Sequence, residues 1–191
     1  IKRYVHLEKG KAFNYDTLRN DLSRLNEHPD RRVKAVLVPG KEPGTTDIVL
    51  EVKDKLPLHA NLSWDNYGSR YLRKNHYTTV ISDNNLLGFD DMFSLQYQLA
   101  DGQDYRLLSL RYLVPVMEKL KIGFWGYKSN LSLGKEYKDL SIRGKSKLYS
   151  LYGIYELRRG ENLTLAVNLG FDYKDNFNFQ TGLEQSRDRL R

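Results

Sequence analysis

The chain has 191 residues, a formal net charge of +7 and no cysteine. Without cysteine it can form neither a disulfide framework nor a thiolate metal site. Hydrophobic residues make up 40% and charged residues 29%, and no run approaches the roughly 18 apolar residues that a membrane-spanning helix needs. These values still permit strands that alternate polar and apolar side chains, which is how a β-barrel crosses a membrane.

The basic balance does not indicate a nucleic-acid partner, because Lys and Arg are spread through every segment instead of gathered on one face. Aromatic residues make up 12% of the chain, and 14 of them are Tyr, a residue typical of membrane-interface girdles. Residues 1–12 lack the apolar core of a signal peptide. We therefore expect a mature or truncated piece of a longer chain.

Residues 1–56 predict a small β-α-β-β domain. Ile1–Leu7 is rich in β-branched and aromatic residues and predicts a short strand. Asn14 is a candidate N-cap of a helix, and Asp16 suits the first turn. One apolar stripe follows at helical spacing: Leu18, Leu22 and Leu25. Pro29 is expected to end this helix, because its ring cannot continue the hydrogen-bond ladder.

Two further strands predict a hairpin under the leucine stripe. The first runs through Val33–Leu37 to the turn signal Pro39-Gly40, and the second covers Thr45–Val52. Gly40 and Gly44 flank the connecting loop, and we expect tight turns there that favour a positive φ. The segment therefore has the pattern of an α+β domain.

From Pro57 onward the chain shows strand patterns without helical periodicity. The expected strands are Leu58–Trp64, Tyr77–Ile81, Phe93–Leu99, Leu108–Val116, Leu120–Leu133, Leu148–Leu157 and Leu163–Tyr173. The expected turns are at Asp83-Asn84-Asn85, Asp101-Gly102, Gly134-Lys135 and Arg159-Gly160. Most strands are about ten residues long, as a tilted membrane strand requires, whereas strands of soluble proteins usually have five or six. A soluble β-meander remains the alternative, because the barrel signal of each strand is weak.

The stretch 10–91 resembles the transporter component of two-partner secretion systems, the haemolysin activation and secretion family of the Omp85 superfamily. The resemblance rests on an ordered series of short motifs: Leu22-Ser23-Arg24-Leu25-Asn26 with Pro29, Val33-Lys34-Ala35-Val36-Leu37-Val38-Pro39-Gly40, Pro43-Gly44-Thr45-Thr46-Asp47, Val52-Lys53-Asp54, Trp64-Asp65-Asn66-Tyr67-Gly68 and Asn85-Leu86-Leu87-Gly88-Phe89-Asp90. Beyond this stretch only the general strand pattern is similar. We do not assign the Arg-Gly-aromatic motif of the family to Arg143-Gly144, because the next residue is Lys145 and not an aromatic residue.

The resemblance implies that residues 1–56 are the barrel-proximal POTRA domain, in the periplasm of a Gram-negative bacterium. It implies that residues 57–191 are the N-terminal strands of an antiparallel transmembrane β-barrel in the outer membrane. Such a pore would export a large exoprotein of the haemolysin or adhesin type, with the POTRA domain recruiting the unfolded substrate and the barrel conducting it. The alternatives are an insertase of the same superfamily and a soluble β-rich binding or scaffold protein.

Two sets of site residues follow from this reading. An extended exoprotein segment, the N-terminal secretion domain, would add as a strand to a sheet edge beside an apolar groove. The expected substrate-binding residues are Leu18, Leu22, Val33, Ala35 and Leu37; the alternative for Leu18 and Leu22 is that they are simply domain core. The expected pore-lining residues are Asn61, Ser63, Gln96, Gln98 and Arg111, with the alternate apolar side chains meeting outer-membrane lipid.

Enzyme chemistry is not indicated. The four histidines show no metal-ligand spacing, and no glycine pattern matches a phosphate-binding loop. Adjacent carboxylates such as Asp90 and Asp91 would point to opposite faces of a strand, which disfavours joint acid–base work. We therefore expect no catalytic residue, no metal, no cofactor and no nucleotide.

Overall fold

The computed structural model describes residues 4–69, 73–133, 142–159, 163–180 and 183–190. It divides into two compact units, one made of residues 1–57 with 157–165 and the other of residues 58–156 with 166–191. We describe each unit by itself.

The first unit contains one helix and one hairpin. Helix α1 spans Tyr15–Leu25, and strands β1 (Arg31–Pro39) and β2 (Thr46–Asp54) pair in antiparallel fashion. Asn14 caps α1 as expected, because its side-chain oxygen accepts from the backbone N–H of Thr17 at 3.1 Å. The buried apolar side chains of this unit are Leu18, Leu25 and Val33. The leucine stripe therefore packs against the hairpin, as the sequence predicted.

The helix ends earlier than the sequence predicted. It stops at Leu25, four residues before Pro29, because Asn26 binds β1 with its side chain. The Asn26 amide oxygen accepts from the backbone N–H of Val33 at 2.8 Å, and its amide nitrogen donates to the carbonyl of Val33 at 2.9 Å. The Asn26 side chain thus makes the two bonds to Val33 that the backbone of a neighbouring strand would make. These bonds end the helix before the chain reaches Pro29.

The predicted N-terminal strand is wrong for the part that the structure describes. Tyr4–Leu7 is not a strand, and residues 1–3 lie outside the described residues. His6 instead binds the helix: its backbone N–H donates to Asp21 Oδ2 at 2.8 Å, and its Nδ1 lies 2.7 Å from Asp21 Oδ1. Asp21 is buried among the leucines of α1. The buried Asp21 carboxylate therefore binds residues 4–7 to the helix. The strand propensity of these residues could not indicate this contact.

The β1–β2 loop needs its two glycines for different reasons. Gly44 has a φ of +81°, as expected for a tight turn. Gly40 has no such φ, so that part of the expectation is wrong. A Cβ on Gly40 would lie 2.2 Å from the Oγ1 atom of Thr45, so the close contact across the loop requires glycine. The Thr45 hydroxyl donates to the carbonyl of Glu42 at 2.7 Å and holds the same loop.

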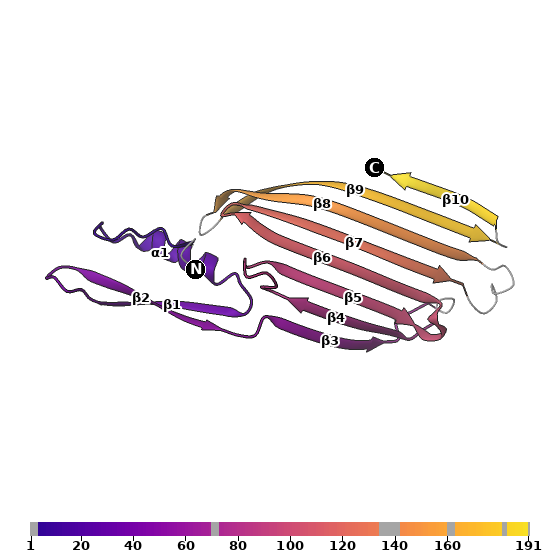
Figure 1. Ribbon diagram of the computed structural model, residues 1–191, viewed down its shortest axis with the longest axis horizontal. Coiled ribbons are helices and arrows are strands. Elements are labelled where there is room, and N and C mark those ends of the chain that lie inside the picture. The colour runs from indigo at the N-terminus through magenta and orange to yellow at the C-terminus, as the bar shows by residue number, and fades with distance from the viewer. Residues whose placement is uncertain (1–3, 70–72, 134–141, 160–162, 181–182, 191) are drawn as a thin grey trace. The chain divides into compact units, whose positions relative to one another are not determined.

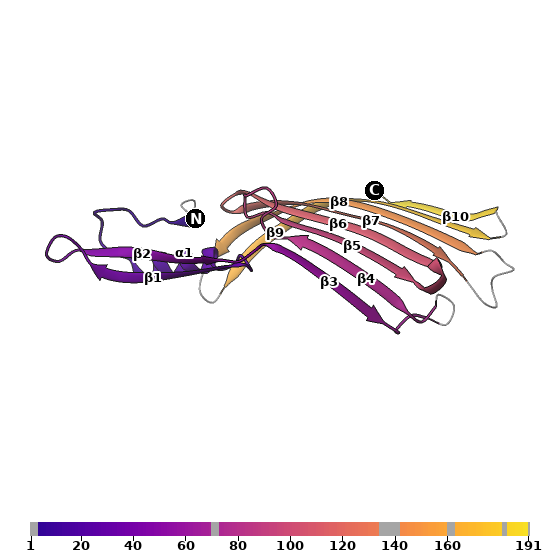
Figure 2. The ribbon, with the colours of Figure 1, turned by 60° about the horizontal axis from the view of Figure 1, so that its bottom comes forward.

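The second unit is one antiparallel sheet of eight strands, in the order β10-β9-β8-β7-β6-β5-β4-β3. The strands are β3 (Leu58–Asp65), β4 (His76–Asp83), β5 (Met92–Ala100), β6 (Tyr105–Met117), β7 (Leu120–Ser132), β8 (Arg143–Arg159), β9 (Thr164–Gln180) and β10 (Leu183–Leu190). A short 3-10 helix, Asp101–Gln103, joins β5 to β6. Each strand pairs with the next along the chain, so the sheet is a meander (Figure 1). Figure 2 shows from a second side that it is twisted and curved.

All seven strands expected after Pro57 are present, and β10 is an eighth that the sequence analysis missed. The turns expected at Asp83-Asn84-Asn85 and Asp101-Gly102 are confirmed. Gly134-Lys135 and Gly160 lie outside the described residues. Strands β8 and β9 have 17 residues each, more than the alternation indicated.

The β4–β5 turn is held by two polar side chains. Asp91 is fully buried, and its carboxylate accepts from the backbone N–H groups of Leu87 at 3.1 Å and Phe89 at 3.3 Å. The Asn85 side-chain oxygen accepts from the backbone N–H of Asp90 at 2.9 Å. These bonds explain the motif at residues 85–91 as a turn, in agreement with its expected role.

Replacing Asp91 by Ala is expected to lower the free energy of unfolding by about 2 kcal/mol, because the part-buried N–H groups of Leu87 and Phe89 would lose a charged acceptor. Asp91→Asn, which keeps one acceptor oxygen, should lose less. Urea unfolding of the full-length protein in lipid vesicles would measure both. Equal stability of wild type and Asp91→Ala would show that the carboxylate does not hold the turn.

Candidate functional site

The large sheet has two chemically different faces. Successive strand residues point to opposite faces, and cross-strand partners share a face, so the register assigns each residue. We call polar face the one that includes His59, Asn61, Ser63, Thr78, Ser82, Ser94, Gln96, Gln98, Ser109, Arg111, Trp125, Tyr127, Ser129, Ser146 and Ser150. We call apolar face the one that includes Leu58, Leu62, Ile81, Leu95, Tyr97, Leu108, Leu110, Tyr112, Phe124, Tyr149 and Leu151.

The five residues expected to line a pore all lie on the polar face, in three adjacent rows across the strands. Asn61 shares a row with Gln96, through Val80 between them. Ser63 shares the next row with Gln98, through Thr78. Arg111 stands in a third row, opposite Ser94. The register thus brings the whole expected set together, and its contact with an exported chain remains a prediction.

Hydrogen bonds between side chains cross the strands on this face. Trp125 donates from its indole nitrogen to Ser109 Oγ at 3.2 Å. Tyr127 Oη lies 3.3 Å from Ser146 Oγ, which donates to Asn176 Oδ1 at 2.6 Å. The polar face therefore holds fixed hydrogen-bonding groups on β6, β7, β8 and β9, as a surface in contact with water would.

A hollow of about 520 Å³ lies on the polar face. Its lining includes Arg111, Trp125, Ser150, Tyr152, Asn168 and Asp172. Arg111 Nε lies 3.4 Å from Tyr152 Oη, and the two opposite charges of Arg111 and Asp172 border the same space. Such a lining can bind polar backbone and water, and it contains no nucleophile paired with a base.

The apolar face is exposed. Leu62 is 80% exposed, Leu151 58% and Leu169 74%. Leu169 belongs to this face because Asn168 and Gly170, its neighbours on β9, line the hollow on the other face. Further exposed members are Leu58, Ile81, Tyr97, Leu108, Phe124, Tyr149, Tyr155, Leu165, Val167 and Phe171. A continuous apolar surface of this extent needs a non-aqueous partner, and lipid is that partner in a membrane barrel.

Several residues of the polar face were missed by sequence analysis, above all Tyr152 on β8. The inward positions of this strand include Leu148, Tyr152 and Ile154, so both faces carry apolar side chains and the alternation is hidden. The place of Tyr152 can be inferred only from the residue beside it on the neighbouring strand, because its cross-strand partner on β7 is Gly123. A glycine facing an aromatic residue in a neighbouring strand is the one sequence signal that could have found it.

In the first unit, the outer edge of β1 offers backbone groups for pairing. The Gly40 N–H donates to the Thr45 carbonyl, and the Lys55 N–H donates to the Asp30 carbonyl, which makes the even-numbered residues of β1 the hydrogen-bonded partners of β2. Hydrogen-bonded and non-bonded pairs alternate in an antiparallel ladder. The N–H and C=O groups of Ala35 and Leu37 therefore point away from β2. Among the described residues, no strand pairs with that edge.

The expected substrate-binding residues are divided between core and surface. Leu18 and Val33 are buried, Leu22 and Ala35 are half-buried, and Leu37 is 51% exposed. Val33 is also occupied at the edge, because both of its backbone groups bind the Asn26 side chain. The structure thus leaves the edge at Ala35 and Leu37 as the accessible part of the set.

No helix within the described residues is long and apolar enough to cross a membrane. The same residues contain no group of three or more His, Asp or Glu side chains placed to hold a metal ion.

An antiparallel meander with one exposed apolar face and one hydrogen-bonded polar face is the architecture of a partial β-barrel of the outer membrane. The chain belongs to the haemolysin secretion/activation protein family ShlB/FhaC/HecB, whose model matches residues 44–191. This family comprises the two-partner secretion transporters of the Omp85 superfamily, as the sequence resemblance indicated. This assignment argues against the alternative of a soluble β-rich binding or scaffold protein.

Two curated relatives are similar over most of the chain. It is 24% identical over 189 residues to the hemolysin transporter protein HpmB of Proteus mirabilis, covering 95% of this chain and 34% of that protein. It is 20% identical over 161 residues to the heme/hemopexin transporter protein HuxB of Haemophilus influenzae, covering 84% of this chain and 28% of that protein. The chain thus spans about a third of the length of these relatives.

Solved structures share the fold. CdiB from Escherichia coli matches with a TM-score of 0.80 at 17% identity, over 99% of this chain and 37% of that chain. BamA from Haemophilus ducreyi, lacking POTRA domains 1–3, matches with a TM-score of 0.65 at 16% identity, over 93% of this chain and 32% of that chain.

Proposed function

We propose that this chain is part of an outer-membrane pore that exports a large exoprotein in two-partner secretion. Residues 57–191 would supply the N-terminal strands of the barrel, and residues 1–56 would be the barrel-proximal POTRA domain in the periplasm. The observation that carries the proposal is the division of the sheet into an exposed apolar face and a polar face that holds Asn61, Gln96 and Arg111. This division suits a wall between lipid and a wet conduit.

The helix and hairpin of the first unit would recruit the exoprotein before it enters the barrel. An extended segment would add to the outer edge of β1, where the backbone groups of Ala35 and Leu37 point outward. Backbone hydrogen bonds would supply affinity without requiring one sequence. The half-exposed Leu37 side chain would contact alternate residues of the added strand, whereas Leu18 would act from within the core.

Ala35→Pro is expected to weaken exoprotein binding about tenfold while the domain stays folded. Proline removes the N–H of residue 35 and places its ring on the outer edge, but it breaks no bond to β2. Calorimetric titration of the full-length protein with the N-terminal region of the exoprotein encoded beside its gene would measure the affinity.

Two matched variants make this test specific. Ala35→Ser keeps the N–H and nearly the same volume, so its affinity should equal that of the wild type. Val36→Pro removes an N–H that faces Val49 of β2, so it should unfold the hairpin, which limited proteolysis would detect. If Ala35→Pro stays folded and binds as the wild type does, exoprotein recruitment does not use this edge.

A further inference from the structure

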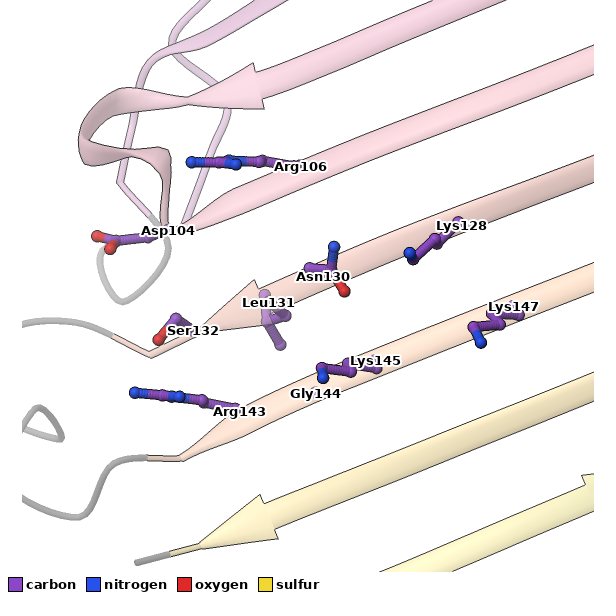
Figure 3. Close-up of a pocket in the computed structure, with 10 residues that line it drawn as sticks. All are labelled: Asp104, Arg106, Lys128, Asn130, Leu131, Ser132, Arg143, Gly144, Lys145 and Lys147. Atoms are coloured by element: carbon purple, nitrogen blue, oxygen red, sulfur yellow. The ribbon is translucent and has the colours of Figure 1, made fainter. Parts of the chain in front are cut away.

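A cluster of cationic side chains lies at one end of the apolar face. It consists of Arg106 on β6, Lys128 on β7, and Arg143, Lys145 and Lys147 on β8. The register places Arg106, Asn130 and Lys145 in one row and Lys128 beside Lys147 in the next. These residues border an open hollow of about 430 Å³, and Figure 3 shows Arg106 and Arg143 extending toward the strand ends on either side of Asn130. We call this set the cationic patch.

The patch carries an excess of positive charge. Asp104 is the acidic side chain in its lining, and that carboxylate already binds Arg73 Nε at 2.8 Å. Within the part of the chain that the structure describes, no ion pair joins Lys128, Arg143 or Lys145 to a carboxylate. Placing Lys128, Arg143 and Lys145 close together on one strand face raises the energy of the isolated surface, so an anionic partner is favoured there.

The position of the patch relative to the apolar band matches a membrane interface. Along β8 the same face changes from Arg143, Lys145 and Lys147 to Tyr149, then Leu151 and onward to Leu157. Lys147 and Leu157 are ten residues apart. At about 3.3 Å per residue and a tilt of about 40°, this separation spans roughly 25 Å across the bilayer, the height of the apolar band of a barrel. The cations therefore begin where hydrocarbon gives way to headgroups.

Neighbouring aromatic side chains support the same depth. Lys145 Nζ lies 5.7 Å from the ring centre of Phe179 on β9, and the Arg187 guanidinium lies 4.0 Å from that of Phe177. The two Phe rings stack, with centroids 6.2 Å apart. Cations seated on aromatic rings are typical of the boundary between lipid and water, where Tyr, Trp and basic residues anchor a barrel.

The strand order decides which leaflet the patch meets. Strand β3 begins directly after residue 57, and the strands alternate in direction, so β6 begins, β7 ends and β8 begins at the end of the sheet away from residue 57. This step rests on the proposed function: if residues 1–56 are periplasmic, that end is at the cell surface. The patch then faces the outer leaflet, whose lipids carry phosphate groups.

We propose that the cationic patch binds the phosphate groups of an anionic glycolipid in the outer leaflet. Lys128, Lys145 and Arg143 would contact phosphate oxygens, while Tyr149 and the leucines beyond it would pack against the acyl chains. The geometry suits one headgroup spread over β6, β7 and β8, since the cations come from three adjacent strands of one face. The patch thereby fixes the depth of these strands in the membrane.

The test is lipid retention by the full-length protein in detergent, followed by native mass spectrometry. The probes are diphosphorylated lipid A and the same lipid without its phosphates. Each Lys or Arg near an anionic surface contributes about fivefold in affinity. Lys128→Gln/Lys145→Gln is therefore expected to bind phosphorylated lipid A about 25-fold more weakly. Lys119→Gln/Lys121→Gln removes two charges at the start of β7, at the end of that strand opposite the patch, and should bind as the wild type does.

Three results would overturn the proposal: equal retention of the two lipids by the wild type, an equal loss in both double variants, or displacement of the lipid by inorganic phosphate at similar concentration. If the patch variant reduced exoprotein export but retained lipid normally, the patch would serve the exported protein instead. The lipid measurement needs no exoprotein. A failure of the secretion assay would therefore count against the proposed function and leave the lipid result standing.

Discussion

Leu169→Arg is expected to destabilise the folded protein in a bilayer by about 2–4 kcal/mol, because the new guanidinium would enter hydrocarbon near the middle of the apolar band. Leu169 is 74% exposed on the apolar face. Its neighbour Gly170 contacts Tyr152, so Leu169 lies level with the centre of the outward row on β8, between Tyr149 and Tyr155. Chemical unfolding of the full-length protein from lipid vesicles would measure the change.

Asn168→Arg is the matched control. Asn168 is the preceding residue of the same strand, but it lines the polar hollow with Arg111 and Asp172. The same guanidinium would there meet water and a carboxylate, so the free energy of unfolding should change by less than about 1 kcal/mol. Equal effects at the two positions, or a neutral Leu169→Arg, would show that the exposed leucines do not face lipid.

The strand pattern could be predicted from sequence because β3, β5, β6 and β9 each contain a run in which apolar side chains recur at every second residue, although β4, β7 and β8 are less regular. Within β3, β5 and β6 this alternation places the five expected pore-lining residues on the polar side of each strand, and the observed register brings these sides together on one face. Strand β10 escaped prediction because its sequence, Leu183–Leu190, is almost wholly polar and has no apolar period. Its place beside β9 comes from pairing, which no local pattern reveals.

In the first unit, the features that the sequence did not predict depend on contacts of polar side chains. The helix and hairpin follow from the leucine stripe, but the helix end and the path of residues 4–7 depend on two polar side chains. The side chain of Asn26 binds Val33 of β1 and that of Asp21 binds His6, so both contacts join α1 to a separate segment of the chain. The accessible edge of β1 likewise depends on which of its backbone groups bond to β2. Hydrogen-bonded and non-bonded pairs alternate along the ladder, and the residue types do not determine which pairs are bonded.

The contact of Gly123 with Tyr152 is the most sensitive packing point of the polar face. A Cβ on Gly123 would lie 2.2 Å from Cζ and 2.6 Å from Oη of Tyr152. The ring thus occupies the space that a side chain on β7 would fill, and its hydroxyl lies 3.4 Å from Arg111 Nε. On the β9 side, a Cβ on Gly170 would already lie 3.1 Å from the Cβ of Tyr152. The ring therefore depends on glycine at position 123 of β7, whereas a side chain at position 170 of β9 would require only a small shift of the Tyr152 Cβ.

Gly123→Val is expected to lower the free energy of unfolding by about 3 kcal/mol, since it displaces the ring and separates Tyr152 from Arg111. Gly153→Val is the control, because a Cβ on Gly153 meets nothing within 4 Å and should be tolerated. In the Tyr152→Ala background the Gly123→Val penalty should largely vanish, which a double-mutant cycle on the full-length protein would measure. Additive effects of the two substitutions would mean that the ring does not depend on Gly123, and that the polar face is held by its hydrogen bonds alone.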